Sequence, residues 1–412
     1  MSGSDAVDNC GNDFLVFRCK NITSAKIQVK RIKNKRKPDR NYFCGMETIK
    51  FFAEVKDFRI NRKKLYSLPE ILLISLCAVV SGAEDFEEIA EYGRQKLSFL
   101  KTFMELPNGI PSHDTFNRVF QHLDKDAFSS SLYRWSKELL GFLADKQVCI
   151  DGKVLCGTDR SGSKKSGICI VTAWACEQRL VLGQQKVAAK SNEKTAIPEL
   201  LDALELAGSI VSIDAIACQP HIAEQIRNKK ADYVLALKKN QGVLFEETVS
   251  RFSSLAAQLP SFEKVEYNGG RIEKRTCTVL NQLFFVDSAA KFKDCQSIIR
   301  IIAERTLKNQ PEKTTQEVRY YLTSLDISPQ NALTICRNHW GIENNLHWML
   351  DVVFNEDHNR SRTKYAAENF ATLRKIALQI LTQNDDKNSI KKRRHIAAWN
   401  DMYLLKLIQP LF

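Results

Sequence analysis

Two aspartates and one glutamate, far apart in the chain, are the residues most able to do chemistry together. Asp151 ends the apolar run "VCID" and Asp214 ends "VSID", while Glu343 stands inside "HWGIENNLHW" between two histidines and two tryptophans. In an α/β sheet the carboxyl edge of the strands is where sites form, and adjacent parallel strands would bring the two aspartates together. An aspartate that ends a strand is also a common turn former, so it is the pairing that indicates a site.

Carboxylates gathered in this way need a cation. Two of them about 5 Å apart repel each other by roughly 3 kcal/mol at an effective dielectric of 20. Mg²⁺ prefers hard oxygen ligands, and two such ions can activate an attacking oxygen and stabilise a leaving one. We therefore predict two Mg²⁺ ions, or Mn²⁺, held by Asp151, Asp214 and a third carboxylate, for which Glu343 is the candidate.

A zinc site is the alternative for the glutamate segment. His339, Glu343 and His347 would lie along one face of a helix, because residues four apart share a face. A zinc hydrolase typically has H-E-x-x-H, with histidines four positions apart. Here the two histidines are twice as far apart in the chain, so the carboxylate cluster is favoured.

Periodicity predicts the elements that must position these acids. Residues 46–145 are expected to be helical: "SLPE" at Ser67–Glu70 fits a capping box, and a helix after "NGIPSHD" has a polar face that suits either DNA reading or an ordinary bundle. From residue 146 the order is β-β-β-α-β-α-β, with a short strand ending at Asp151 and with Pro198 in the first turn of a helix. Three strand-like runs form an insertion at about 245–327, and helices return after Ser328-Pro329 and hold to about Gln383.

The predicted fold is therefore α/β: a ribonuclease H-like mixed sheet with a β-rich insertion, preceded by a small all-α domain. The expected domains are a basic, disordered leader (1–45), a helical domain for binding DNA ends (46–145) and the catalytic domain (146–412).

The charge of the chain points to a polyanionic partner. The net charge is +13, and residues 1–45 hold ten basic and four acidic residues, which is +6 of that total. Nucleic acid is the leading candidate. The leader is interpreted either as a solvated tail or as a phosphate-gripping arm, and a start at Met46 would make it incidental.

The compartment is expected to be the cytoplasm. The twelve cysteines show no metal-knuckle spacing and are interpreted as reduced thiols. The longest apolar run, Ile71 to Val80, would rise only about 15 Å as a helix against roughly 30 Å of bilayer hydrocarbon, so we expect a core helix and no membrane partner. The N-terminus has no secretory signal pattern.

Several long motifs resemble one family. They are "IDGK", "KSNEKTAIPELL", "SIDAIACQ", "YVLALKKNQ", "GRIEKR", "HWGIENNLHWMLDVVFNED" and "AAENFATLRKIALQIL". Together they resemble bacterial insertion-sequence transposases of the H-repeat-associated family, in the DDE group, from about Met46 to Phe412. The resemblance implies Asp151, Asp214 and Glu343 as the metal-binding triad. It also implies metal-dependent cleavage of double-stranded DNA at the element's ends, transfer of the freed strand into target DNA, and a homodimer on the DNA ends.

Phosphoryl transfer of this kind depends on positioning and charge neutralisation, so basic and polar groups should surround the triad. By motif position we expect DNA contacts from these residues: Lys153, Lys238, Lys239, Asn240, Gln241, Arg271, Asn344, His347 and Trp348. Packing within a helix would explain Trp348 equally well.

Three positions depart from the family pattern. Cys156, Cys169 and Gly269 stand where an arginine, a histidine and a histidine are usual. Each change removes a polar or cationic group, so a catalytically decayed copy that only binds DNA, through the helical region and "KKRRH" at Lys391–His395, is the alternative function. A general ribonuclease H-type nuclease is the third.

Overall fold

The computed structural model describes residues 52, 55–61, 64–141, 143–159, 167–188, 193–255 and 257–411. The predicted basic leader and Met46 lie outside the described residues. Nine cysteines are described, and all nine are free thiols, as predicted for them. No helix within the described ranges is long and apolar enough to cross a membrane.

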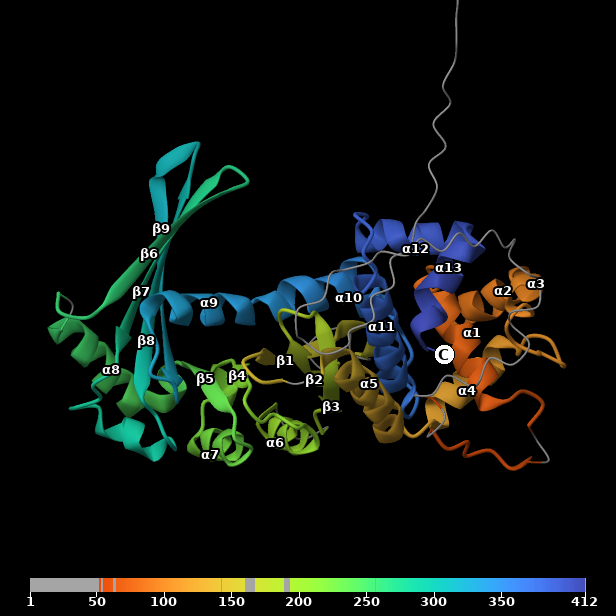
Figure 1. Cartoon of the computed structure of the whole chain (residues 1–412), viewed down its shortest axis with the longest axis horizontal. Coiled ribbons are helices and arrows are strands. Elements are labelled where there is room, and N and C mark those ends of the chain that lie inside the picture. The colour runs from red at the N-terminus through yellow and green to blue at the C-terminus, as the bar shows by residue number, and fades with distance from the viewer. Residues whose placement is uncertain are drawn as a thin grey trace, which may run out of the picture. The chain divides into compact units, whose positions relative to one another are not determined.

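The N-terminal region is helical (Figure 1). The predicted capping box is present: the Ser67 hydroxyl accepts from the Glu70 backbone N–H, and the Glu70 carboxylate accepts from the Ser67 N–H at 2.9 Å. The apolar helix behind it is buried along most of its length, as expected of a core helix. The helices are α1 (Leu68–Val80), α2 (Phe86–Gln95), α3 (Leu97–Leu100), α4 (His113–His122) and α5 (Lys125–Leu140).

One nine-stranded sheet runs through the protein in the order β3-β2-β1-β4-β5-β9-β8-β7-β6. Strands β1, β2 and β3 are antiparallel neighbours, whereas β1, β4 and β5 are parallel to one another. This is the ribonuclease H-like order that the sequence predicts. The elements are β1 (Gln147–Leu155), β2 (Ile168–Ala175), β3 (Leu180–Lys186), α6 (Glu193–Ala203), β4 (Ile210–Ile213), α7 (Pro220–Asn228) and β5 (Asp232–Leu237).

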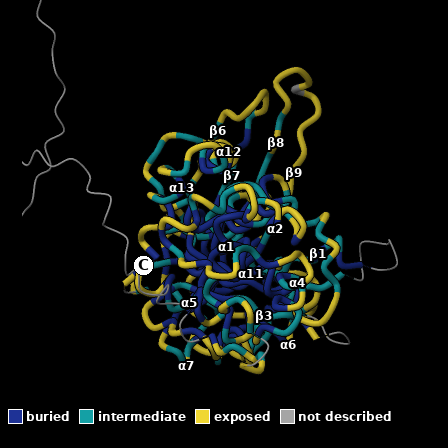
Figure 2. The backbone as a smooth tube through the Cα atoms, turned by 90° about the vertical axis from the view of Figure 1, so that its right-hand side faces the viewer, coloured by how far each residue is buried: buried dark blue, intermediate teal, exposed yellow. Residues whose placement is uncertain are grey.

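The insertion continues this sheet, because β9 pairs antiparallel with β5. It contains four strands where the sequence predicted three. The missed strand, β6, is mostly exposed and belongs to a long hairpin whose tip projects from the molecule (Figure 2), so it carries no buried apolar run. The insertion consists of α8 (Gly242–Ser254), β6 (Ser261–Asn268), β7 (Arg271–Leu280), β8 (Ser297–Leu307) and β9 (Gln310–Thr323).

Two predicted boundaries near the site are wrong. Strand β1 does not end at Asp151 but continues to Leu155, because it stays paired with β2 after its pairing with β4 has stopped at Ile150. Helix α6 begins at Glu193, so Pro198 lies inside the helix and not in its first turn.

The C-terminal helices cover the sheet and complete the core. Helix α9 begins after the predicted Ser328 cap, and the helical run is interrupted at Asn355, whose φ of +52° is left-handed. Helix α11 is buried along almost its whole length and packs against α1, α4 and α5, so the N-terminal helices share their core with it. These elements are α9 (Pro329–His339), a π-helical turn (Glu343–His347), α10 (Trp348–Val352), α11 (Ala366–Thr382), α12 (Ile390–Trp399) and α13 (Asp401–Ile408).

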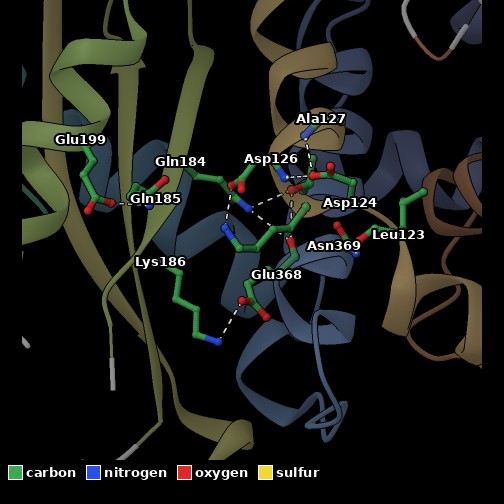
Figure 3. Close-up of polar contacts among 12 residues, drawn as sticks. Leu123, Asp124, Asp126, Ala127, Gln184, Gln185, Lys186, Glu199, Glu368 and Asn369 are labelled. Carbon is green, nitrogen blue, oxygen red and sulfur yellow. Dashed lines mark hydrogen bonds and ion pairs between the residues drawn. The ribbon is translucent and has the colours of Figure 1, made fainter. Parts of the chain in front are cut away.

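Polar contacts fix α11 between the sheet and the helices (Figure 3). Lys186 on β3 forms an ion pair with Glu368 at 2.9 Å. The Asn369 amide donates to the carbonyls of Phe120 and Leu123 at 2.8 and 2.9 Å, where α4 ends. Buried donors and acceptors that are paired in this way fix one packing arrangement.

The stretch "KKRRH" lies on α12, and two of its four basic side chains are buried. Arg393 and Arg394 are buried, and Arg394 donates to the Val79 carbonyl at the end of α1. Lys391 and Lys392 are exposed. Arg393 also contacts Asp386 at 2.7 Å.

Asp386 links the C-terminal helices α12 and α13 through hydrogen bonds. It accepts from Arg393 on α12, from the Asn388 N–H at 2.9 Å and from the Tyr403 hydroxyl on α13. Burial acts to raise the pKa of Asp386, but these hydrogen bonds outweigh it and lower the pKa to about 2.

Candidate active site

Asp151 and Asp214 occupy matching positions on neighbouring parallel strands. Ile150 of β1 is paired with Ile213 of β4, and each aspartate directly follows its isoleucine. Neighbouring strands lie about 4.8 Å apart, so the register brings the two aspartates together at the carboxyl edge of the sheet. This is the arrangement that the sequence predicted.

The carboxylates of the site act on one another electrostatically. The pKa of Asp151 is raised to about 7, first by burial and then by the negative charges of Glu343, Glu193 and Asp214, against the lowering effect of the Gly152 N–H, which donates to it at 2.9 Å. All three predicted acids therefore belong to one electrostatic cluster. Within the described ranges, however, no three acidic, histidine or cysteine side chains lie close enough together to coordinate one metal ion.

Glu343 is exposed and begins the π-helical turn between α9 and α10. Such turns are rare and are frequently found at functional sites. The segment approaches β2 closely at Gly341, where an added Cβ would lie 3.2 Å from the Trp174 ring. Its neighbour Ile342 is fully buried, which anchors the turn that presents the glutamate.

The two histidines of the segment contact different strands. Nδ1 of His347 lies 3.5 Å from a carboxylate oxygen of Asp151, whereas Nδ1 of His339 lies 3.0 Å from the Ser212 hydroxyl of β4. Burial lowers the pKa of His347 to about 3 and that of His339 to about 4, so both are neutral. They form no zinc group with Glu343 in the part of the chain that the structure describes.

Lys153 faces the protein interior. Its ammonium lies 2.5 Å from Asp351, 2.9 Å from Glu356 and 3.3 Å from Asp357. Burial acts to lower the pKa of Lys153, but the charge of Glu356 and the contacts with Asp351 outweigh it and raise the pKa. Lys153 therefore links β1 to α10, which carries Asp351, and to Glu356 and Asp357 after α10.

The loop after β5 supports the loop after β4. The Asn240 amide donates to the Ala215 carbonyl and the Gln241 amide to the Cys218 carbonyl, both at 2.8 Å. Lys238 forms an ion pair with Asp214 at 3.3 Å, and Lys239 is exposed. Of these four predicted DNA contacts, Asn240 and Gln241 hold the backbone that follows Asp214. Lys238 and Lys239 are exposed positive charges.

A cleft of about 920 Å³ opens beside Glu343, between α9 and the insertion strands. Arg271 and Asn344 from the predicted set line it, and Arg271 contacts Glu273 at 2.8 Å. Trp348 lies on α10 and is 52% exposed. Sequence reasoning missed several basic and aromatic residues of the cleft, among them residues of β7, β8, β9 and α9 and the residue that caps α9: Arg275, Arg305, Arg319, Arg337 and Trp340.

Glu193 is the acidic residue at the site that sequence reasoning missed. The thiol of Cys169 donates to its carboxylate at 3.6 Å, and a Cβ added to Gly152 would lie 2.4 Å from its carboxyl carbon. The only signal in the sequence was its place in the motif "KSNEK". One of the three departures from the family pattern, Cys169, thus contacts an acid whose charge acts on Asp151. Of the other two, Cys156 follows β1, and Gly269 lies in the β6–β7 turn with φ +48°.

The chemistry of the three acids, though not their spacing in this structure, suits a divalent metal of the Mg²⁺ type. The donors are carboxylate oxygens, which hard cations prefer. Burial raises the pKa of Asp151, and the negative charges of Glu343, Glu193 and Asp214 raise it further; a bound cation would offset those charges.

Comparison with known proteins identifies the family of the chain. The family model described as "Transposase DDE domain" matches residues 143–380, and "DDE_Tnp_1-associated" matches residues 49–136. The chain is 37% identical to "Putative transposase YncI" of Escherichia coli O157:H7, over 87% of this chain and 93% of that one. It is 36% identical to "H repeat-associated putative transposase YhhI" of Escherichia coli K12, over 86% and 95% of the two chains.

A shorter relative and a solved structure are also similar. "Inactive transposase YbfQ" of Escherichia coli K12 is 48% identical over 63 residues, which is 15% of this chain and 75% of that one. A structure of piggyBac transposase in a synaptic complex with hairpin DNA matches with a TM-score of 0.40 and 10% identity, over 88% of this chain and 77% of that one. From the family models and the full-length relatives, the chain belongs to the DDE transposase family, among the H repeat-associated transposases.

Proposed function

We propose that this protein catalyses metal-dependent cleavage and strand transfer of DNA at the ends of an insertion sequence. The observation that carries the proposal is the register of β1 and β4, because it puts Asp151 and Asp214 side by side at the carboxyl edge of the sheet. Glu343 is the third acid, since its charge acts on Asp151.

Asp151, Asp214 and Glu343 would hold two Mg²⁺ or Mn²⁺ ions. Bound there, the ions would activate water or a 3′-hydroxyl and neutralise the scissile phosphate. The chain's own contribution is positioning: Ile342 and Gly341 anchor the turn that carries Glu343, and His347, kept neutral by burial, faces Asp151.

Double-stranded DNA is the proposed partner, bound by exposed groups around the triad. Lys238 and Lys239 lie beside Asp214, and Arg271, Asn344 and Trp348 lie at or near the cleft by Glu343. Lys153 and His347 are outside this set, because Lys153 is engaged by three carboxylates and His347 is mostly buried. Two copies of the chain would hold the two ends of the element.

Strand cleavage of the flanking end sequences tests this function. The full-length protein is incubated with a DNA fragment that carries those ends, with Mg²⁺, with Mn²⁺ and with chelator, and the products are resolved by strand. We expect nicks at the ends only with metal, and none with Glu343→Gln. Equal nicking by the variant would refute the role of Glu343, and nicking without regard to end sequence would favour a general nuclease.

A decayed, DNA-binding copy is the second candidate, and one observation favours it. Cys169 stands where the family pattern has a histidine, and its thiol contacts Glu193, whose charge acts on Asp151. For this candidate, the end-sequence assay gives salt-sensitive binding without cleavage in either metal, and Cys169→His would be the first variant to restore cleavage.

A further inference from the structure

Four arginines form a row along one face of the insertion strands. Arg275 on β7 is paired with Ala303 on β8, and Ala303 is paired with Glu317 on β9. Because side chains alternate between the two faces of a strand, residues an even number of positions from these three share the face of Arg275. The row, called the arginine track below, runs inward from the β6–β7 turn through Arg271, Arg305, Arg275 and Arg319. Each arginine occupies its own level of the sheet, and successive levels are two residues, or about 7 Å, apart.

The arginine track forms one wall of the cleft beside Glu343. Helix α9 forms the other wall, and it packs across β6, β7 and β8 (Figure 1). At the inner end of the track the guanidinium of Arg319 lies over the ring of Trp340, 3.8 Å from its centroid. Stacking on an aromatic ring fixes the plane of a guanidinium group. Trp340 is three residues before Glu343, so the track ends at the turn that carries this acid.

The cleft holds more positive charge than the acids beside it neutralise. Among the described residues that line it, Lys and Arg outnumber Glu by seven to four. Two carboxylates, Glu266 and Glu273, are shared by five cations: Lys264, Arg271, Arg275, Arg305 and Arg337. The shared carboxylates hold the side chains in place, and they leave three positive charges in excess for an external anion to neutralise.

The shape of the cleft indicates which anion fits it. A small anion would contact one or two of the four arginines, whereas each strand of a nucleic acid carries a charge at every nucleotide. The volume of about 920 Å³ is that of a small-molecule pocket, which spans about 300–1,000 Å³. The cleft therefore has room for a few nucleotides of one strand and not for a duplex.

We propose that the arginine track binds the phosphates of an unpaired DNA strand and leads that strand to Glu343. This inference rests on the proposed function and names the surface by which one strand reaches the site. Arg305 tests it most cleanly, because its side chain is 56% exposed and its ion pair with Glu273, at 3.5 Å, is long. Its removal should therefore leave the fold intact.

The test is fluorescence anisotropy of the full-length protein with a labelled single-stranded oligonucleotide and with a duplex of the same sequence, in chelator and at several salt concentrations. Each phosphate contact contributes about 0.7 to the slope of log affinity against log salt for a single strand. We expect Arg305→Gln to lower this slope by about 0.7 and Arg305→Lys, which keeps the charge, to retain it. Arg94→Gln on α2 is the matched control, since Arg94 is 55% exposed and is also paired with a glutamate; its slope should equal that of the wild type.

An unchanged slope in Arg305→Gln overturns the proposal. A fall for the duplex as large as that for the single strand overturns the assignment to an unpaired strand. Cleavage of the end fragment by the same proteins separates the two levels of inference. If the wild type cleaves only with metal while Arg305→Gln keeps the wild-type slope, the proposed function stands and the arginine track does not. If the slope falls as expected but the wild type cleaves in neither metal, the track stands and the catalytic function is overturned.

Discussion

Replacing Lys153 by methionine distinguishes a structural tie from a DNA contact. The sequence predicted that Lys153 touches phosphate, but its ammonium contacts Asp351, Glu356 and Asp357 within 3.3 Å, and the Glu356 side chain is only 1% exposed. Lys153→Met keeps most of the aliphatic volume and leaves these carboxylates without their shared cation. The variant therefore tests the interior ion pairs directly.

The expected loss is large. Breaking a buried ion pair by removing one partner costs about 3–5 kcal/mol, against a total stability of about 5–15 kcal/mol for a typical domain. Glu356 is also stabilised by the charges of Lys375 and Arg374, which places the expected loss near the lower end of that range. The cost should shrink in acid, because the pKa of Glu356 is lowered in the folded protein, and its contribution is lost as the carboxylate protonates below its ordinary pKa of 4.5.

Urea unfolding at neutral pH and near pH 4 measures both effects. Lys137→Met is the matched control, since Lys137 also forms a 2.7 Å ion pair, with Glu205, but on the exposed surface, where little change is expected. If Lys153→Met loses less than about 1 kcal/mol in its free energy of unfolding and also binds DNA more weakly, the structural role is refuted. The prediction that Lys153 contacts phosphate would then stand.

Three further substitutions test other parts of the structure. Without metal, Asp151→Asn should stabilise the protein at about pH 8 by up to about 4 kcal/mol: the pKa of Asp151 is raised from 3.8 to about 7, so wild-type stability falls as pH rises through that interval, and denaturation in chelator should show no such fall in the variant. Asp386→Asn should cost about 1 kcal/mol at neutral pH after solvent screening; the pKa is lowered, so the difference should vanish in urea titrations as pH falls from 3.8 towards 2. Gly157→Ala should lower the Tm by an amount equivalent to about 1–3 kcal/mol, because its Cβ would lie 2.4 Å from the Asn359 carbonyl oxygen, whereas Gly242→Ala, which meets nothing within 4 Å, should not.

The end of β4 was predictable and the end of β1 was not, for one physical reason. Strand β4 is paired on both sides and its residues are almost all buried, so its apolar run stops where the strand stops, at Ile213. Strand β1 is continuously buried only from Gln147 to Ile150; beyond it the strand pairs with β2 alone, and half-buried residues such as Lys153 are tolerated until Leu155 is buried again. A run of apolar residues indicates burial. It therefore shows where a strand ends only if burial and strand pairing end at the same residue.

The same reason explains why parts of the site escaped prediction. Strand β6 has no buried face, so its alternation carries no signal. The π-helical turn at Glu343 has the composition of an ordinary helix. Glu193 precedes the apolar positions of α6, where a polar residue is usually solvated, and only the close approach to Gly152 shows that it turns inward.

The sequence shows that Asp151 and Lys153 carry opposite charges, but it does not show which groups each of them contacts. The structure shows that they contact different groups. Asp151 and Lys153 are two residues apart on one strand, so their side chains leave the same face of the sheet. The Asp151 carboxylate is acted on by other carboxylates, while the Lys153 ammonium contacts Asp351 on α10 and the buried Glu356 after it. Because Lys153 contacts these acids and not Asp151, the repulsion at Asp151 is left for an external cation to offset. A lysine that contacted Asp151 directly would lower its pKa and supply the positive charge itself, so the distance of Lys153 from Asp151 leaves that charge for a metal ion to supply.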